Sequence, residues 1–375
     1  MATFTASSLL DDPARRASRA PMLAAITMAR GGDGVAVVAN LLWRAVERHW
    51  PDARLVTMFD GRARTPGLTD KASFAASLMT ELAAHRPGAI VYSHLGLARA
   101  QAYVPSLLER PFAVFLHGVE AWGALAEADV RLLQQARLRL ANSEFTASRV
   151  SEAHPSIGAI VACPLALVED GYASIVLSAD AADALPNEGP IVLVVGRMHA
   201  AEAYKGHDQL IEAWPAVIAQ IPTANLVMVG DGNDRPRLEH KARLVTGCQR
   251  IHFLGFAPAA LLDACYQQAS VFALPSRGEG FGLVYLEAMA HALPCIGSRQ
   301  DAAGDVIVDG TTGHLVDQTD TAALGARIVQ LLANERERQS MGEAGKRRLL
   351  TEFSEAAFGA RLVSALEAAF DDNSR

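Results

Sequence analysis

Hydrophobic residues occur along the first half of the chain in short runs, separated by longer stretches with the 3.6-residue spacing of amphipathic helices. The runs predict strands at residues 22–27, 54–59, 89–93, 112–116 and 139–142, and the longer stretches predict helices at 35–49, 73–85 and 126–137. Because strands and helices alternate, we expect a parallel sheet with helices on both faces.

A polar stretch, residues 180–189, interrupts this alternation and has the Pro and Gly content of a linker. Beyond it, strands are predicted at 191–195, 225–229, 251–254, 271–274 and 294–298, and helices at 206–219, 236–244, 259–268, 283–291 and 355–370. The predicted fold class is therefore α/β, with two doubly wound Rossmann-like domains facing across a cleft. A ligand is expected at the carboxyl ends of the strands.

We place an N-terminal domain at residues 1–187, a second domain at 188–352 and a terminal helical segment at 353–375. The last helix carries Phe358, Leu362 and Leu366 on one side, so it is expected to pack back on the N-terminal domain. Residues 1–20 lack the apolar core of a secretion signal, and no apolar run reaches the length of a membrane span.

Composition narrows the function classes. Half of the residues are hydrophobic and the net charge is -7, which favours a folded protein and does not suggest nucleic-acid binding. The four cysteines show neither zinc-ligand spacing nor a disulfide pattern, so buried free thiols in a reducing cytoplasm are expected.

Net charge is distributed unevenly, with -1 in residues 1–187 and -6 in the remainder. Residues 1–187 carry 17 basic and 18 acidic side chains, and Lys71 is the only lysine among them. A compositional preference for arginine would explain this. Alternatively, some of these arginines face anionic lipid or a phosphate-bearing acceptor, which would bring the first domain into transient contact with a membrane surface.

The segment after residue 274 is the most informative part of the chain. A buried strand ends at Leu274, a loop with Gly278, Gly280 and Gly282 follows, and a helix begins at Leu283. Glycines let backbone N–H groups approach a ligand closely, and a helix N-terminus favours a phosphate. This arrangement predicts a phosphate site.

Two glutamates accompany the glycine loop. Glu279 lies within it, and Glu287 lies in the helix that follows. Carboxylates accept hydrogen bonds from paired hydroxyls, so one could hold a ribose diol and the other the hydroxyls of a hexose. The alternative for Glu287, a solvated surface side chain, fits poorly with its apolar neighbours in Val-Tyr-Leu-Glu-Ala-Met-Ala.

Together these residues form Pro-Ser-Arg-Gly-Glu-Gly-Phe-Gly-Leu-Val-Tyr-Leu-Glu-Ala-Met-Ala. This segment resembles the signature of glycosyltransferase family 4, whose members are retaining enzymes of the GT-B fold. The resemblance is strong over roughly residues 190–350 and weak in the first half. It implies a nucleoside diphosphate sugar as donor, with Glu279 in a catalytic role and Gly280, Phe281, Gly282, Leu283 and Glu287 as donor-binding residues.

Further donor residues follow from the same resemblance. Val-Gly-Arg-Met and Tyr-Lys-Gly-His resemble family motifs in which the arginine and lysine, here Arg197 and Lys205, hold the donor diphosphate. Two cations there would stabilise the charge of the leaving nucleoside diphosphate, so no metal or other cofactor is expected. Standing alone, Lys205 would be read as a surface lysine. The main chain near Phe256 is expected to contact the nucleobase.

In the first half, the glycine-rich turn at 29–34 occupies the place of the family's Gly-Gly loop. Gly32 is a candidate contact for the donor phosphate, and Arg30 and Asp33 are candidates for acceptor contacts. A glycine-rich turn after a strand is common, so this signal is weak by itself.

His117 ends a predicted strand in Phe-Leu-His-Gly-Val-Glu and resembles the family's central histidine beside the transferred sugar. Glu120 is either an acceptor-side carboxylate or part of the cap of the next helix. His94 ends the preceding strand and is a candidate for the acceptor groove.

The sequence thus predicts a cytoplasmic, retaining, metal-independent hexosyltransferase, with mannose and glucose donors favoured. Its acceptor would be a saccharide or a lipid-linked saccharide. Two alternatives are a sugar-nucleotide epimerase of the same fold and an inactive partner subunit that only binds nucleotide sugar. A phosphorylase would need a pyridoxal lysine, and no lysine lies in a matching context.

Overall fold

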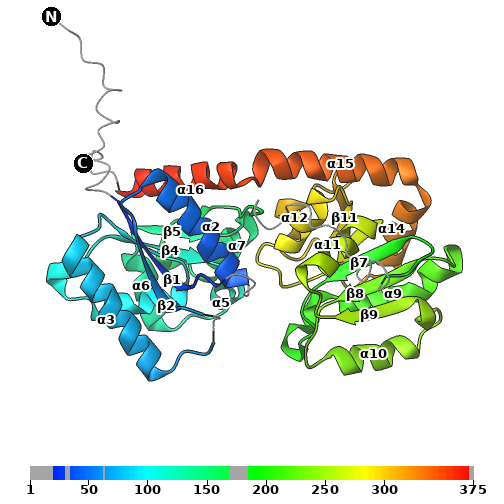
Figure 1. Cartoon of the computed structure of the whole chain (residues 1–375), viewed down its shortest axis with the longest axis horizontal. Coiled ribbons are helices and arrows are strands. Elements are labelled where there is room, and N and C mark those ends of the chain that lie inside the picture. Colours follow the sequence, from blue (N-terminus) through cyan, green and yellow to red (C-terminus); the bar gives the residue numbers. More distant parts are fainter. Residues whose placement is uncertain (1–19, 30–33, 62–63, 169–184, 371–375) are drawn as a thin grey trace, which may run out of the picture. The chain divides into compact units, whose positions relative to one another are not determined.

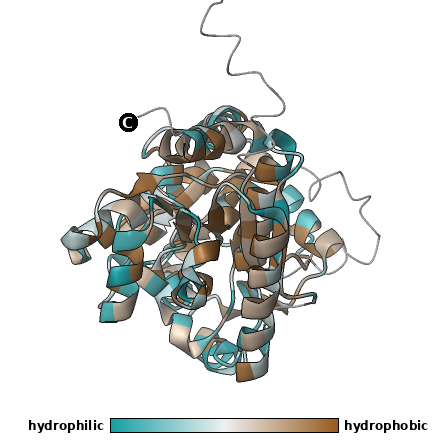
Figure 2. Ribbon diagram, turned by 90° about the vertical axis from the view of Figure 1, so that its left-hand side faces the viewer, coloured by the Kyte–Doolittle hydropathy of each residue, from teal (hydrophilic) through white to brown (hydrophobic). Residues whose placement is uncertain are grey.

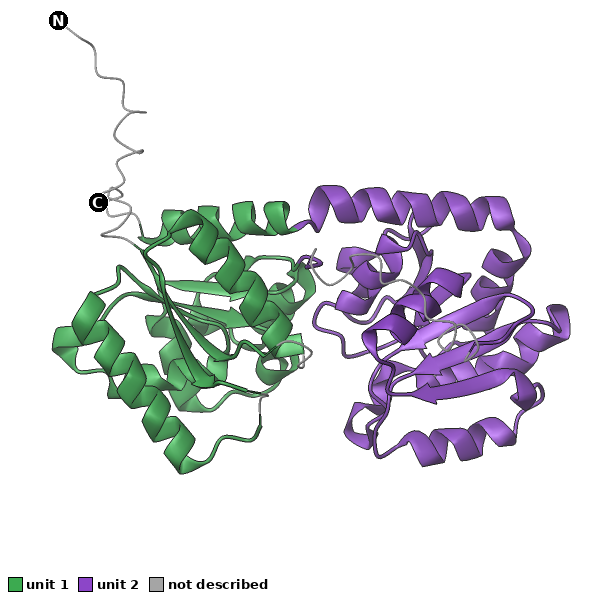
Figure 3. Cartoon of the chain, in the orientation of Figure 1, with its two compact units in different colours: residues 1–165, 355–375 green, residues 166–354 purple. Residues whose placement is uncertain are grey.

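The computed structural model describes residues 20–29, 34–61, 64–168 and 185–370, and its contacts divide the chain into two compact units (Figure 3). Unit 1 comprises residues 1–165 and 355–375, and unit 2 comprises residues 166–354. Each unit contains a parallel sheet of six strands with helices packed against it (Figure 1). The predicted α/β class with two doubly wound domains is confirmed.

Unit 1 has the strand order β2-β1-β3-β4-β5-β6. Its elements are β1 (Met22–Thr27), α2 (Gly34–His49), β2 (Arg54–Phe59), α3 (Leu68–His85), β3 (Ile90–Tyr92), α4 (Leu95–Ala98), η2 (Arg99–Tyr103), η3 (Ser106–Leu108), β4 (Phe112–Leu116), α5 (Val119–Trp122), α6 (Glu127–Gln135), β5 (Leu138–Ala141), α7 (Glu144–Ala153), η4 (Pro155–Ile157), β6 (Val161–Ala162) and α16 (Glu355–Phe370).

Strand β1 shows why the sheet of unit 1 is buried on both sides. Met22 and Ala24 belong to a core cluster with Phe74 of α3, whereas Leu23, although fully buried, is not in that cluster. Successive side chains of a strand point to opposite faces, so both faces of β1 must be covered. Figure 2 shows hydrophobic residues gathered toward the interior and hydrophilic residues on the outward-facing sides of the helices.

Helix α16 completes unit 1 although it comes last in the sequence. It packs against α2, and its residues Phe358, Leu362 and Leu366 are buried. Glu355 at its start pairs with Arg44 of α2 at 3.2 Å. The final helix is therefore part of the first unit's core.

Unit 2 has the strand order β12-β11-β10-β7-β8-β9. Its elements are β7 (Ile191–Val195), η6 (Ala200–Lys205), α9 (His207–Gln220), β8 (Asn225–Val229), α10 (Arg235–Arg243), η7 (Cys248–Arg250), β9 (Ile251–Gly255), α11 (Ala259–Gln268), β10 (Val271–Leu274), α12 (Leu283–Ala290), β11 (Cys295–Ser298), α13 (Ala303–Val306), β12 (Gly313–Val316), α14 (Thr321–Ala333) and α15 (Glu335–Glu352).

Several details differ from the sequence-based expectations, among them a domain boundary, a helix start and the burial of one cysteine. The chain enters unit 2 at residue 166 rather than 188, and the backbone N–H of Leu167 donates to the carbonyl of Phe353 in the same unit. Helix α3 begins at Leu68, before the predicted start at residue 73, because Asp70 caps it by accepting from the backbone N–H of Gly67. Cys248 is only partly buried, whereas Cys163, Cys265 and Cys295 are buried free thiols.

Candidate functional site

The strand order of unit 2 reverses at β7 and β10. These two strands are paired in parallel, and the chain continues from β7 to β8 on one side and from β10 to β11 on the other. Loops that leave adjacent strands in opposite directions open a crevice at the carboxyl edge of the sheet, where ligands of such folds bind. The loops after β7 and β10 therefore define the candidate site.

The loop after β10 is held by close packing against Tyr204. A Cβ on Gly278 would lie 2.5 Å from the Tyr204 ring, so only glycine fits there. The backbone N–H of Arg277 donates to the Tyr204 carbonyl at 2.9 Å. Phe281 is buried and packs edge-on against Phe353 with ring centroids 5.8 Å apart. Its ring therefore anchors the loop.

Helix α12 begins directly after this loop. Gly282 is its N-cap, with a φ of +87° that disfavours other residues, and Leu283 is its half-buried first residue. The hydroxyl of Tyr285 donates to the carbonyl of Leu274 at 2.6 Å and ties the helix to the end of β10. The amino end of α12 is thus fixed beside the glycine loop.

Lys205 and Glu279 form the central ion pair of the site. Lys205 Nζ lies 2.5 Å from Glu279 Oε1, and the two side chains are only 12% and 16% exposed. Burial lowers the pKa of Lys205, but the negative charge and hydrogen bond of Glu279 outweigh it, so this pKa lies above its usual value. Lys205 therefore stays protonated at neutral pH.

Arg197 and Glu202 form a second ion pair next to the first. Arg197 Nη2 lies 2.7 Å from Glu202 Oε1, and Lys205 Nζ lies 4.0 Å from Glu202 Oε2. The predicted cations Arg197 and Lys205 are thus brought together by one carboxylate. Glu202 was not among the predicted residues, because it lies in a short segment without a recognisable pattern.

Asp301 is a second acidic residue that the sequence did not point to. It follows β11, is almost fully buried and accepts hydrogen bonds from the backbone N–H groups of Glu279 and Ala303, both at 3.0 Å. Burial raises the pKa of Asp301 to about 7, although these backbone hydrogen bonds act in the opposite direction. A carboxyl group that titrates near neutral pH thus supports the backbone of Glu279.

We expect this proton to make stability depend on pH. In the unfolded chain an aspartate carboxyl titrates near ~3.9. The contribution of Asp301 to the free energy of unfolding is therefore fully present below that pH and is lost as pH rises through about 7. Urea unfolding at pH 4.5 and pH 8 should show that Asp301→Asn removes a pH-dependent loss of about 2–4 kcal/mol.

The control for this prediction is Asp317→Asn. The hydroxyl and backbone N–H of Thr319 lower the pKa of this exposed carboxylate, so it titrates below the tested range. Its replacement should leave the difference between pH 4.5 and pH 8 as in the wild type. Equal pH dependence in the wild type and Asp301→Asn would contradict the argument.

The turn after β8 packs backbone to backbone on the loop that carries Arg197. A Cβ on Gly230 would lie 2.0 Å from the carbonyl oxygen of Gly196, and Gly230 has a φ of +134°. Its N–H donates to the carbonyl of Gly255 at 2.8 Å, at the end of β9. Phe256 follows with 77% of its surface exposed. The turn therefore links Phe256, the candidate nucleobase contact, to the loop after β7 that carries Arg197.

Glu287 is held by an aromatic neighbour rather than left to solvent. Tyr266 is fully buried and its hydroxyl donates to Glu287 Oε2 at 2.7 Å. The Tyr266 ring stacks on His291 with centroids 5.3 Å apart, and His291 Nε2 pairs with Asp263 at 2.9 Å. This chain of contacts fixes the carboxylate's position on α12.

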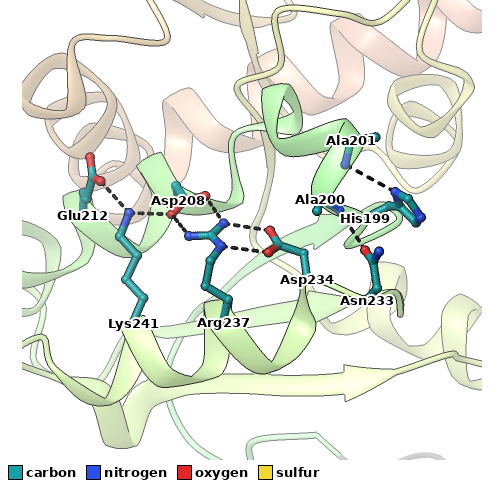
Figure 4. A network of polar contacts seen from close by, with 9 residues as sticks. All are labelled: His199, Ala200, Ala201, Asp208, Glu212, Asn233, Asp234, Arg237 and Lys241. Carbon is teal, nitrogen blue, oxygen red and sulfur yellow. Dashed lines mark hydrogen bonds and ion pairs between the residues drawn. The ribbon is translucent and has the colours of Figure 1, made fainter.

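A network of charged residues joins α9 and α10 in unit 2 (Figure 4). Arg237 donates to Asp208, one residue after His207, and to Asp234, at 2.7–2.8 Å. The Arg237 hydrogen bonds lower the pKa of Asp208 to about 2. Lys241 reaches both Asp208 and Glu212. The network fixes the helices that follow Lys205 and the Gly230 turn.

Unit 1 brings two predicted histidines together at the carboxyl ends of β3 and β4. The rings of His94 and His117 have centroids 5.4 Å apart. His117 Nε2 donates to the carbonyl of Ser93 at 2.6 Å, which leaves Nδ1 of the neutral ring as an acceptor. His94 Nδ1 accepts from the N–H of Gly96 and caps α4. His117 therefore presents Nδ1 as a hydrogen-bond acceptor.

Glu120 serves the backbone of unit 1. Its Oε1 accepts from the N–H of His117 at 2.5 Å, across the start of α5. This contact lies next to the start of α5, and the acceptor-side role of Glu120 stays a prediction. The candidates Arg30, Gly32 and Asp33 lie outside the described residues.

Two kinds of feature are absent from the described part of the chain. No helix among these residues is long and apolar enough to cross a membrane. The same residues contain no group of three or more His, Cys, Asp or Glu side chains placed to hold a metal ion.

Comparisons with curated proteins show relatives that align over part of the chain. A GDP-mannose-dependent alpha-(1-6)-phosphatidylinositol monomannoside mannosyltransferase of Mycolicibacterium smegmatis is 34% identical over 184 residues, 47% of each chain. A phosphatidyl-myo-inositol mannosyltransferase of Mycobacterium leprae is 37% identical over 43% of this chain and 42% of its own length. The chain thus spans about half the length of the curated relatives it matches.

Solved structures resemble the chain over most of its length. Sucrose-phosphate synthase from Thermosynechococcus elongatus superposes with a TM-score of 0.75 at 21% identity, covering 94% of this chain and 99% of that one. Anabaena HepE, solved in complex with UDP-glucose, gives a TM-score of 0.74 at 17% identity, covering 93% and 99%. These similarities concern the fold.

The family comparison concerns the unit that contains Arg197, Lys205, Glu279 and Glu287. Residues 189–334 match the family described as "Glycosyl transferases group 1". This stretch runs from just before β7 to the end of α14, so it includes the whole sheet of unit 2 and every predicted donor contact in that unit. Residues 189–334 are therefore similar to the group 1 glycosyl transferases, and this similarity confirms the resemblance to glycosyltransferase family 4 found in the sequence.

Proposed function

We propose that the chain transfers a hexose from a nucleoside diphosphate sugar to a hydroxyl group of an acceptor. The observation that carries this proposal is the Lys205–Glu279 pair beside the amino end of α12, with Arg197 next to it. Two cations and a helix N-terminus suit a diphosphate. Relatives named for GDP-mannose favour mannose as the transferred sugar. Structures of similar fold solved with UDP or UDP-glucose make glucose the second candidate.

The proposed reaction is a front-side displacement without a metal ion. The bond from the anomeric carbon to the diphosphate breaks, and the acceptor oxygen bonds to the same face. A phosphate oxygen of the leaving group takes the hydroxyl proton. Arg197 and Lys205 stabilise the charge that develops on the diphosphate, and fixed cations of this kind commonly contribute several kcal/mol.

The test combines binding with product analysis. GDP-mannose and UDP-glucose are each titrated in thermal-shift and calorimetric measurements, since a specific donor at 100 times its Kd stabilises by about 2.7 kcal/mol. NMR of the product from the bound donor should then show a retained anomeric configuration. Binding without turnover would identify a nucleotide-sugar-binding subunit instead, and absence of binding would refute the proposal.

We also propose that the acceptor is lipid-linked and that unit 1 touches the inner face of the membrane. Leu68 of α3, Tyr103 of η2 and Leu107 of η3 are largely exposed, and α3 packs against η3. Exposed apolar side chains near one another mark interaction surfaces. Leu107→Asp should reduce cosedimentation with anionic vesicles several-fold, whereas Leu244→Asp, at another largely exposed position in unit 2, should not. Equal effects would contradict this assignment.

A further inference from the structure

Glu202 lies between the two cations that the proposed donor would need. Its Oε1 is 2.7 Å from Arg197 Nη2, and its Oε2 is 4.0 Å from Lys205 Nζ. The Glu202 side chain is 16% exposed, whereas that of Arg197 is 70% exposed. A solvent-accessible guanidinium is thus held by a carboxylate that itself lies largely out of solvent.

The position of Glu202 is set by a short anchored segment. The N–H of Ala200 donates to Asn233 Oδ1 at 2.9 Å, and the N–H of Ala201 donates to His199 Nδ1 (Figure 4). The N–H of Glu202 donates to the carbonyl of His199 at 2.7 Å, and the backbone there departs from helical geometry. The segment thereby directs one carboxylate at two basic side chains.

The two carboxylates of the site divide the two cations between them. Glu279 neutralises Lys205 at 2.5 Å, and Glu202 neutralises Arg197. Glu202 Oε2 is buried, and among the described residues no donor makes a hydrogen bond to it. A buried acceptor with only a distant cation is poorly compensated. The Glu202 carboxylate is therefore the less firmly bound of the two.

We propose that Glu202 is an internal substitute for a donor phosphate and competes with the diphosphate for Arg197 and Lys205. This inference rests on the proposed function. When the nucleoside diphosphate binds, its oxygens replace Glu202 Oε1 on the guanidinium. When transfer is complete, Glu202 returns to Arg197 and promotes release of the nucleoside diphosphate. The charge of Glu202 therefore weakens diphosphate binding.

The experiment measures calorimetric Kd values for UDP, GDP, UMP and GMP with the wild type and Glu202→Gln. Glutamine keeps the size of the side chain and a carbonyl oxygen for Arg197 but removes the charge. We expect three- to tenfold tighter binding of whichever diphosphate the wild type prefers, and a smaller change for the matching monophosphate. The control is Glu212→Gln, which removes one charge from a comparable 2.5 Å pair with Lys241 in the same unit.

The outcomes separate this inference from the proposed function. A wild type that binds neither diphosphate refutes the proposed function and this inference with it. A wild type that binds one, together with unchanged or weaker binding by Glu202→Gln, overturns only the role of Glu202. Tighter binding by Glu212→Gln to the same extent would trace the effect to net charge and would also overturn it.

Discussion

Lys205→Ala is expected to lower kcat/KM for the sugar nucleotide by about 10²–10³-fold. Lys205 is the more buried of the two cations, and its ammonium lies 2.5 Å from Glu279. Its removal takes a positive charge from the leaving diphosphate and leaves Glu279 as an unneutralised carboxylate beside that group. Both changes disfavour the charge that develops in transfer. The measurement is steady-state kinetics with the donor identified by binding.

The chain offers a matched control for this prediction in Lys241. This lysine also lies within 2.5–2.6 Å of two carboxylates, those of Asp208 and Glu212, but on α10. Lys241→Ala should change stability slightly and kcat/KM by less than about threefold, as ion pairs near the surface contribute little. Similar losses in both variants would show that the effect at Lys205 is structural.

Gly230→Ala is expected to destabilise unit 2 by about 3–5 kcal/mol. The residue has a φ of +134°, and an added Cβ would lie 2.0 Å from the carbonyl oxygen of Gly196. Backbone atoms cannot yield as a flexible side chain can, so the loop that carries Arg197 must move. Urea unfolding and diphosphate binding should both report the loss.

Gly310→Ala separates the two causes of this loss. Gly310 also has a positive φ, +75°, but no atom lies within 4 Å of the position of an added Cβ. Its replacement should therefore cost only the backbone strain, about 1 kcal/mol. If Gly230→Ala is no more damaging than Gly310→Ala, the close approach of the two loops is not what requires glycine.

The sequence predicted the buried parts of the fold well. β7, β8 and β10 match their predicted ranges residue for residue, because each is a largely apolar run bounded by turn-forming or polar residues; only Asn225, at the start of β8, is polar. The short strand β6 and helix α7 were not predicted. β6 has only two residues, so it shows no periodicity.

The candidate site was predicted where a residue belongs to a continuous motif. Lys205 and Glu279 lie 74 positions apart in sequence and were still expected in one site, since each belongs to a recognisable segment. Glu202 and Asp301 were missed, because their importance depends on which side chains the folded loops bring beside them. Burial and unlike neighbours decide such roles, and neither is visible in a local pattern.

The place of α16 has a consequence for how the chain is made on the ribosome. Phe358, Leu362 and Leu366 cover part of the core of unit 1, yet they are synthesised after all of unit 2. While unit 2 emerges, the matching surface of α2 stays uncovered and open to chaperones. Translation products that stop before residue 355 would keep that apolar strip exposed, so we expect them to aggregate or to be degraded.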